Sequence, residues 1–360
     1  MIFPEYIPSV PFYPNKKYSV VLILAWPDTA IKNVTEWYGR IINKISGSKS
    51  YKYRYGHSAY CIIEPDGSIR YADFGRYMTS LGFGRARSAH TDPNLTIPIQ
   101  AKIKVNNKGE KIISNIRDIV HYLASHPNET HGDGRLVFSY NNTISHKKID
   151  EYIEHLQDQH EIPYSPFSKK TTNCARFTSS SISKASQDLW VRFKLSLPEL
   201  GTPIPVGVCI AGKSTSSKVW EYNLEKRTMS DSSYSRFSAS LEIIRNIFIT
   251  NSEVDTNEIY TDNSSIKKTY PHAQEIIGIG AKAHYLLEDC ESLAVYEFRV
   301  RRFSNGNRDP DYDIIVACPS NSFSIQNNFT IQHASQKRRT RVRQNETVKD
   351  LFFVREYKNN

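Results

Sequence analysis

Residues 56–75, GHSAYCIIEPDGSIRYADFG, have the pattern of one β-hairpin, and this hairpin organises the expected architecture of the N-terminal half. Pro-Asp-Gly at 65–67 is typical of a three-residue turn, with glycine at the position that needs a left-handed backbone. This turn sets the register and predicts three cross-strand pairs: Tyr60 with Ala72, Ala59 with Asp73, and His57 with Gly75. Since side chains alternate along a strand, His57 and Asp73 are expected on the same face of the sheet.

The segments around this hairpin extend the sheet and supply helices. VVLILAW at 20–26 is too short to span a bilayer, which needs about 20 residues, and it is expected to be a buried strand within 18–26. Asp28 or Thr29 would cap a helix reaching about residue 45. Further on, the pattern predicts a strand at 97–105, a helix at 114–123, a strand at 136–140, a helix after Ser145, and a helix from Thr172 or Asn173 to Ala185.

The chain changes character after about residue 190. Three prolines in 186–206 suggest a linker at 191–205, between a domain at 18–190 and a β-rich accessory domain at 206–360. Residues 1–17 are expected to form an extended arm. Strand-like runs in the last part lie at 206–211, 218–223, 276–281, 293–303, 312–318, 322–332 and 350–357. The fold class expected is α+β, with an N-terminal antiparallel sheet packed on helices and a C-terminal, mostly antiparallel β domain.

Composition limits the class of protein further. The 360 residues carry 47 Lys and Arg against 37 Asp and Glu, a formal charge of +10, and 39% are hydrophobic. Such a chain has enough apolar residues for a packed core, and its charge permits acidic partners without identifying them. Five cysteines without a CxxC pair argue against a disulfide-built secreted domain. With no signal peptide or transmembrane segment visible, we expect a cytoplasmic protein.

A second motif, TTNCARF at 171–177, suggests nucleophilic chemistry. A cysteine in the first turn of a helix lies at the positive end of the helix dipole, which favours thiolate over thiol. Cys174 with His57 in hydrogen-bond reach would be an activated nucleophile, and Asp73 is placed to orient the imidazole. The alternative is that Cys174 is a small buried core residue and His57 a structural histidine, because spacing alone does not show that they meet.

The order of these segments resembles the circularly permuted branch of the papain-like, NlpC-type thiol hydrolases, which is related in layout to lecithin–retinol acyltransferase. Residues 56–59 and 173–177 are similar to its two signature regions, and residues 71–75 resemble its strand after the histidine. The resemblance covers about 18–190 and requires an insertion, within about 82–135, between His57 and Cys174. It implies a Cys174–His57–Asp73 triad, in which the third, polar position varies within the branch.

The resemblance also implies a reaction. The Cys174 thiolate would attack a carbonyl carbon, and His57 would protonate the leaving group and then activate water or a second acceptor. The Cys174 amide would donate to the oxyanion; Asn173 is a candidate for a second donor or a helix cap, and Tyr71 for support beneath the site. We expect a cysteine-dependent peptidase or amidase, or an acyltransferase, acting on a peptide, amide or acyl substrate without a metal or organic cofactor.

Other motifs favour weaker alternatives. Ser179 occupies the position where a cysteine phosphatase loop needs arginine, and three histidines at 121, 126 and 131 do not share a helix face. The basic run at 337–343 puts Arg339, Arg341 and Arg343 on one face of a strand, which predicts either weak polyanion binding or a charged, solvated sheet edge. The alternative function is therefore a noncatalytic binding or scaffold protein that uses the basic β-rich domain.

Overall fold

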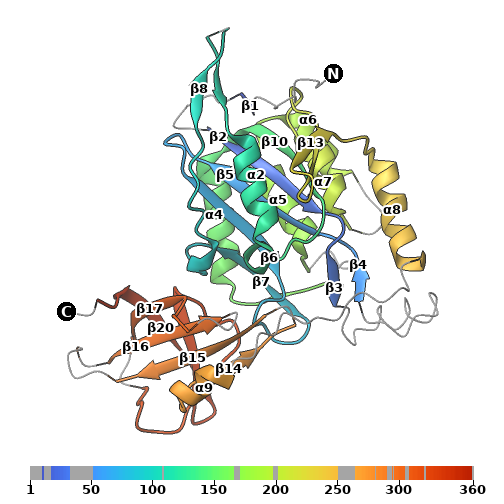
Figure 1. Ribbon diagram of the computed structural model, residues 1–360. Coiled ribbons are helices and arrows are strands. Elements are labelled where there is room, and N and C mark those ends of the chain that lie inside the picture. Colours follow the sequence, from blue (N-terminus) through green and yellow to red (C-terminus); the bar gives the residue numbers. More distant parts are fainter. Residues whose placement is uncertain are drawn as a thin grey trace. The chain divides into compact units, whose positions relative to one another are not determined.

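The computed structural model shows an α+β protein whose chain divides into two compact units (Figure 1). The first unit comprises residues 1–74, 95–158 and 165–255, and the second 75–94, 159–164 and 256–360. The residues described are 10–11, 18–32, 52–107, 109–165, 171–197, 202–249, 264–279, 281–289, 294, 296–304, 308–319 and 322–358. The expected fold class is confirmed.

An antiparallel sheet forms the centre of the first unit. Its strands lie in the order β6 (Ile69–Gly75), β5 (His57–Ile63), β2 (Tyr18–Trp26), β10 (Leu136–Ser145), β12 (Trp220–Asn223) and β13 (Thr228–Asp231). The hairpin register is as predicted for two pairs, Ala59 with Asp73 and Tyr60 with Ala72. The turn is closed by Gly67, which has φ +88° and donates its N–H to the Glu64 carbonyl at 2.9 Å.

Helices cover both faces of this sheet. The helices of the unit are α2 (Ile116–Ser125), α3 (Pro127–Thr130), α4 (His146–Asp158), α5 (Cys174–Ala185), α6 (Leu189–Ser196), α7 (Pro205–Gly212) and α8 (Arg236–Ile249). On one face, α2 packs Ile119 and Leu123 against strand residues such as Leu22 and Leu24. On the other face, α5 lies against β5, where Tyr60 donates to the Ser181 hydroxyl.

Short elements complete the unit. Strands β1 (Val10–Pro11), β9 (Lys111–Ile113) and β8 (Ile103–Val105) form a small sheet, and β3 (Ala30–Lys32) pairs with β4 (Lys52–Arg54). The 3₁₀ turn η1 (Pro93–Leu95) contains the last two residues of the 75–94 segment of the second unit and the first residue of the 95–158 segment of the first. The expected strand at 97–105 is therefore confined to its last three residues. Of the helix expected at 29–45, residues 30–32 are strand, and the remainder from 33 lies outside the described residues.

The strand expected at 206–211 is wrong, because this stretch is helix α7. A short apolar run cannot be assigned by periodicity when it is buried on all sides, and Pro205 at its first turn suits a helix start. Burial explains the apolar sequence: the Cys209 carbonyl accepts from Ser139 of β10, and the Cys209 thiol points at the Ile23 carbonyl of β2. The stretch predicted as a linker, 191–205, also contains most of α6.

The second unit is a nearly closed antiparallel β domain. Its strands lie in the order β14 (Gln274–Ile277), β15 (Lys282–Glu288), β16 (Glu297–Ser304), β17 (Tyr312–Ala317), β20 (Thr347–Glu356), β19 (Arg339–Gln344) and β18 (Thr330–Ile331). The first and last strands meet at Gln274, whose side chain bonds Ile331 N–H and the Phe329 carbonyl. Helix α9 (Ser264–Thr269) and the pair β7 (Phe83–Ser88) with β11 (Ile162–Pro163) belong to this unit.

The units depart from the predicted domain limits. Residues 206–255 fall in the first unit, because β12 pairs with β10 and so extends the first sheet. Residues 75–94 fall in the second, because Asp92 is held by the β-domain residue Arg302. Long-range pairing, which composition does not reveal, sets both boundaries.

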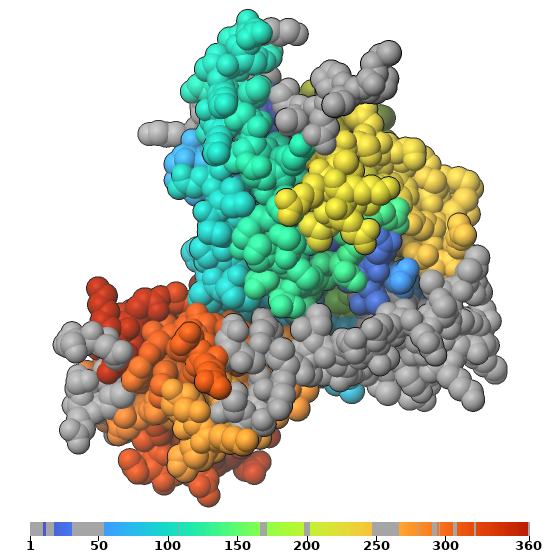
Figure 2. All heavy atoms as spheres, in the orientation of Figure 1, coloured from blue at the N-terminus to red at the C-terminus, as the bar shows by residue number. Residues whose placement is uncertain are grey.

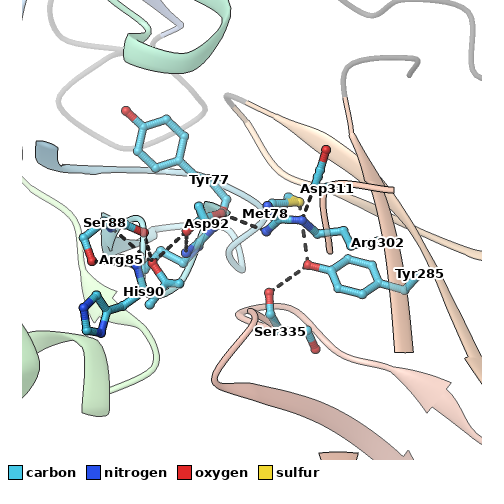
Figure 3. Close-up of polar contacts among 11 residues, drawn as sticks. Tyr77, Met78, Arg85, Ser88, His90, Asp92, Tyr285, Arg302, Asp311 and Ser335 are labelled. Carbon is cyan, nitrogen blue, oxygen red and sulfur yellow. Dashed lines mark hydrogen bonds and ion pairs between the residues drawn. The ribbon is translucent and has the colours of Figure 1, made fainter. Parts of the chain in front are cut away.

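A buried ion network holds residues 75–94 inside the second unit (Figure 3). Asp92 accepts two hydrogen bonds from Arg85, both at 2.7 Å, and one from Arg302 at 2.8 Å. Arg302 also donates to Asp311 at 2.9 Å. Burial raises the pKa of Asp92, but attraction by Arg85 and Arg302 outweighs it and holds this pKa well below the usual range. These charges therefore remain ionised inside the core.

Candidate functional site

The loop before α5 positions Cys174 as the first residue of that helix. Asn173 caps it: its side-chain oxygen accepts from Arg176 N–H at 2.8 Å, and its amide donates to the Thr202 hydroxyl at 2.9 Å. Arg176 holds the loop by donating to the Thr171 carbonyl at 2.7 Å. Asn173 is thus engaged as a cap, the second of its two expected roles, and Cys174 sits at the positive end of the helix dipole.

The entry into β5 fixes His57. Gly56 has φ +78°, and a Cβ there would lie 2.9 Å from the Trp26 carbonyl, so only glycine suits this position. Trp26 pairs with His57 across the strands, and the two rings stack with centroids 6.0 Å apart. The indole thus covers one face of the imidazole.

Asp73, on the neighbouring strand β6, faces the same ring. Its Oδ2 lies 3.4 Å from His57 Nε2, and its side chain is fully buried. Tyr71 donates its hydroxyl to the same carboxylate oxygen at 3.1 Å and also lies 3.1 Å from the Thr130 carbonyl. The Tyr71 hydroxyl is therefore bonded to the carboxylate that faces His57.

His57 interacts with Asp73 and Cys174 together. Burial lowers the pKa of His57, but contacts with Asp73 and Cys174 and the attraction of both outweigh it and raise this pKa to about 9. The ring is therefore an imidazolium at neutral pH. The structure thus brings Cys174 to the hairpin that carries His57 and Asp73, with the imidazolium next to the thiol.

The two side chains proposed to react are both buried. Cys174 keeps 8% of its surface exposed and His57 keeps 5%. Cys61 lies in the core on the His57 face of β5, and burial raises the pKa of its thiol. Cys61 is therefore unsuited to act as a second nucleophile.

The predicted polyanion residues lie in the second unit. Arg341 pairs with Asp350 at 3.1 Å, and Arg339 approaches the same carboxylate at 4.0 Å, whereas Arg343 is exposed. Asp350 thus reduces the positive charge of this strand face. Among the described residues, no cluster of three His, Cys, Asp or Glu side chains could hold a metal ion, and no helix has the length and hydropathy to cross a membrane.

Two residues of this site were not expected from the sequence. Trp26 ends a correctly predicted strand, but its stacking on His57 depends on the pairing of β2 with β5. Thr130 contributes a backbone carbonyl, which carries no sequence signal. Of Trp26, Thr130 and Gly56, only Gly56 had a local signal in the sequence, because it is a glycine directly before a predicted strand.

Two family models match separate parts of this chain. Residues 21–190 match the model of TseH-like type VI secretion system effectors, and residues 273–353 match that of the DUF6695 C-terminal domain. The first match spans just under half of the chain and includes Cys174, His57 and Asp73.

Comparison with individual proteins adds little. The crystal structure of the type VI secretion system effector TseH aligns with 16% identity and a TM-score of 0.37, covering 60% of this chain and 98% of that one. A similarity of this size identifies neither a shared fold nor a shared activity. No curated protein matches the sequence.

Proposed function

We propose that the first unit is a cysteine-dependent hydrolase of the peptidase or amidase type, or an acyltransferase, with Cys174 as nucleophile, His57 as acid and base, and Asp73 as the orienting carboxylate. The observation that carries this proposal is the position of His57, which contacts both Asp73 and Cys174 and has its pKa raised to about 9. A structural histidine would not need a buried carboxylate on one side and a thiol at a helix N-terminus on the other.

The chemistry follows from this arrangement. The Cys174 thiolate attacks the carbonyl carbon of a peptide, amide or acyl group, and the helix N-terminus stabilises the oxyanion through the Cys174 N–H. The tetrahedral intermediate collapses as the His57 imidazolium gives its proton to the leaving group. Neutral His57 then removes a proton from water or from another acceptor, which attacks the thioester and releases the thiol.

The family match supports the same reading. The matched stretch, 21–190, contains the three residues and the elements that carry them, β5, β6 and α5. We infer that the protein is an effector-type enzyme of this class.

The test is the reactivity of Cys174 toward iodoacetamide, followed by peptide mass spectrometry. We expect Cys174 to react at least about tenfold faster than Cys61, Cys209 and Cys318, although all four are buried, because Cys174 contacts His57 at a helix N-terminus. The variant His57→Ala should lose this advantage. The matched control, His155→Ala on the exposed face of α4, should keep it.

Slow, uniform labelling of all cysteines would contradict the proposal and favour the noncatalytic alternative. Equal loss of reactivity in the two histidine variants would mean that His57 has no specific part in activating the thiol. Circular dichroism of each variant separates lost reactivity from lost folding.

A further inference from the structure

Two helices of the first unit expose apolar faces to solvent. The exposed side chains are 39% to 73% accessible and comprise Leu189, Trp190, Phe193 and Leu197 of the α6 region and Phe237, Leu241 and Ile244 of α8. On α8 they are spaced four and three residues apart, which is one helix face. We call these seven residues the α6–α8 surface. In Figure 2, atoms of α8 (gold) lie at the outside of the molecule.

Both helices pack on the rest of the first unit through other residues. Their exposed apolar faces are therefore not used in that packing. Helix α6 buries Val191, and α8 buries Ala239. Ile243 and Asn246 of α8 line a small crevice with Pro205 of α7. Solvated helix faces are normally polar, and clustered exposed tryptophan, phenylalanine and leucine mark a binding surface.

The two helices meet at a cluster of cations. Arg236, the first residue of α8, donates to the carbonyl of Lys194 in α6 at 3.3 Å. Burial lowers the pKa of Lys194, Asp188 raises it, and the charge of Arg236 lowers it further. Burial and the charge of Lys194 lower the pKa of Lys213, the residue after α7. Like charges are thus held near one another, which an anionic partner would relieve.

Further charges favour the same kind of partner. Arg192 of α6 and Arg245 of α8 are exposed on the helices that carry the apolar residues. The carboxylate of α8, Glu242, is engaged by Arg135 at 2.8 Å and by Tyr234 at 2.5 Å. The surroundings of the α6–α8 surface are therefore positive.

We propose that the α6–α8 surface docks on an anionic lipid bilayer, with its apolar side chains in the interfacial region and the surrounding cations against lipid phosphates. A helix that combines Trp, Phe and Leu with Arg and Lys lies in the plane of a bilayer surface and does not span it. A second copy of the chain fits less well, because a two-fold contact would bring the same cations against each other. Docking would hold the unit that carries Cys174 at a membrane surface.

The experiment is co-sedimentation of the full chain with vesicles of phosphatidylcholine, with and without phosphatidylglycerol. We expect binding to the anionic vesicles that weakens with added salt. The double variant Trp190→Ser/Phe193→Ser should bind at least about tenfold more weakly, since it removes the buried apolar area. Replacing Arg192 or Arg245 by Gln should weaken binding by roughly fivefold each at low salt.

A matched control keeps the test specific. Leu81→Ser/Val105→Ser removes apolar side chains that are similarly exposed but lie outside these helices, and it should bind as the parent does. Protection of the buried Cys61 and Cys209 from iodoacetamide in each variant reports that the first unit is folded.

Equal binding to neutral and anionic vesicles, no binding, or equal effects of the two double variants would overturn the proposal. Sedimentation velocity gives a further test, because it measures the oligomeric state. If the parent is a dimer and Trp190→Ser/Phe193→Ser is a monomer, the α6–α8 surface binds a second copy of the chain instead of a bilayer.

Discussion

The two units each contain buried charges, but they treat them differently. In the second unit, Asp92 is held by two arginines through hydrogen bonds of 2.7 to 2.8 Å (Figure 3). In the first, Asp73 stands 3.4 Å from His57, and His57 Nε2 finds no partner with good hydrogen-bond geometry among the described residues. The Asp92 carboxylate is thus bound by short hydrogen bonds, whereas Asp73 and His57 are loosely paired.

This difference separates a structural role from a chemical one. A satisfied, bidentate network has no unused hydrogen-bonding capacity and serves to fix residues 75–94 in the β domain. A loosely paired imidazolium beside a thiol can move a proton during a reaction. Substitutions in the two clusters should therefore change different properties.

Asp92→Asn should destabilise the second unit by roughly 3–5 kcal/mol, because it leaves the buried Arg85 with a neutral partner and Arg302 with Asp311 as its remaining carboxylate. Hydrogen exchange of β16 amides, read by mass spectrometry, measures the loss. The exposed control Asp309→Asn should leave this exchange unchanged. If Asp92→Asn also left it unchanged, the network would not be what fixes residues 75–94.

His57 should make the stability of the first unit depend on pH. Because its pKa is raised from 6.5 to about 9, its contribution is full below pH 6.5 and is lost as the pH rises through about 9. The difference in unfolding free energy between the parent and His57→Gln should fall by up to about 3 kcal/mol over this interval. Urea unfolding followed by tryptophan fluorescence measures it, since all four tryptophans lie in the first unit. A pH-independent difference would contradict the prediction.

Asp73→Asn should lower the pKa of His57 by about one unit or more, because it removes the charge of a facing carboxylate. The imidazole proton resonances of His57, followed by NMR across the pH range, give this value directly. Exchange at β16 should stay as in the parent, in contrast to Asp92→Asn. An unchanged His57 titration would remove Asp73 from the proposed triad.

Tyr71→Phe should have the smallest effect, about 1 kcal/mol in unfolding free energy, because it removes one hydroxyl that donates to Asp73. The substitution should also shift the pKa of His57 slightly, because the Asp73 carboxylate would lose the hydrogen bond from the Tyr71 hydroxyl. A loss of stability without any such shift would make Tyr71 a packing residue alone.

Local patterns predicted the elements of the site well. The turn at 65–67 fixed the register that puts Asp73 beside Ala59, and Asn173 marked the start of the helix that begins with Cys174. Both signals act within a few residues, where backbone geometry and capping decide the structure. The prediction of secondary structure failed for α7, where a short apolar run fits either a strand or a helix. Because α7 is buried on all sides, its hydrophobic residues show no helical periodicity.

Short-range signals are therefore enough to specify the hairpin, the capped cysteine helix and the α+β class, since turns, caps and alternation act over a few residues. The contact of His57 with Cys174, the stacking of Trp26 on the imidazole and the pairing of Asp92 with Arg302 depend instead on the tertiary structure. The first and third of these contacts join residues more than a hundred positions apart. The second, between Trp26 and His57, joins strands β2 and β5. Their formation depends on how strands pair and helices pack across the whole chain, which no local pattern records.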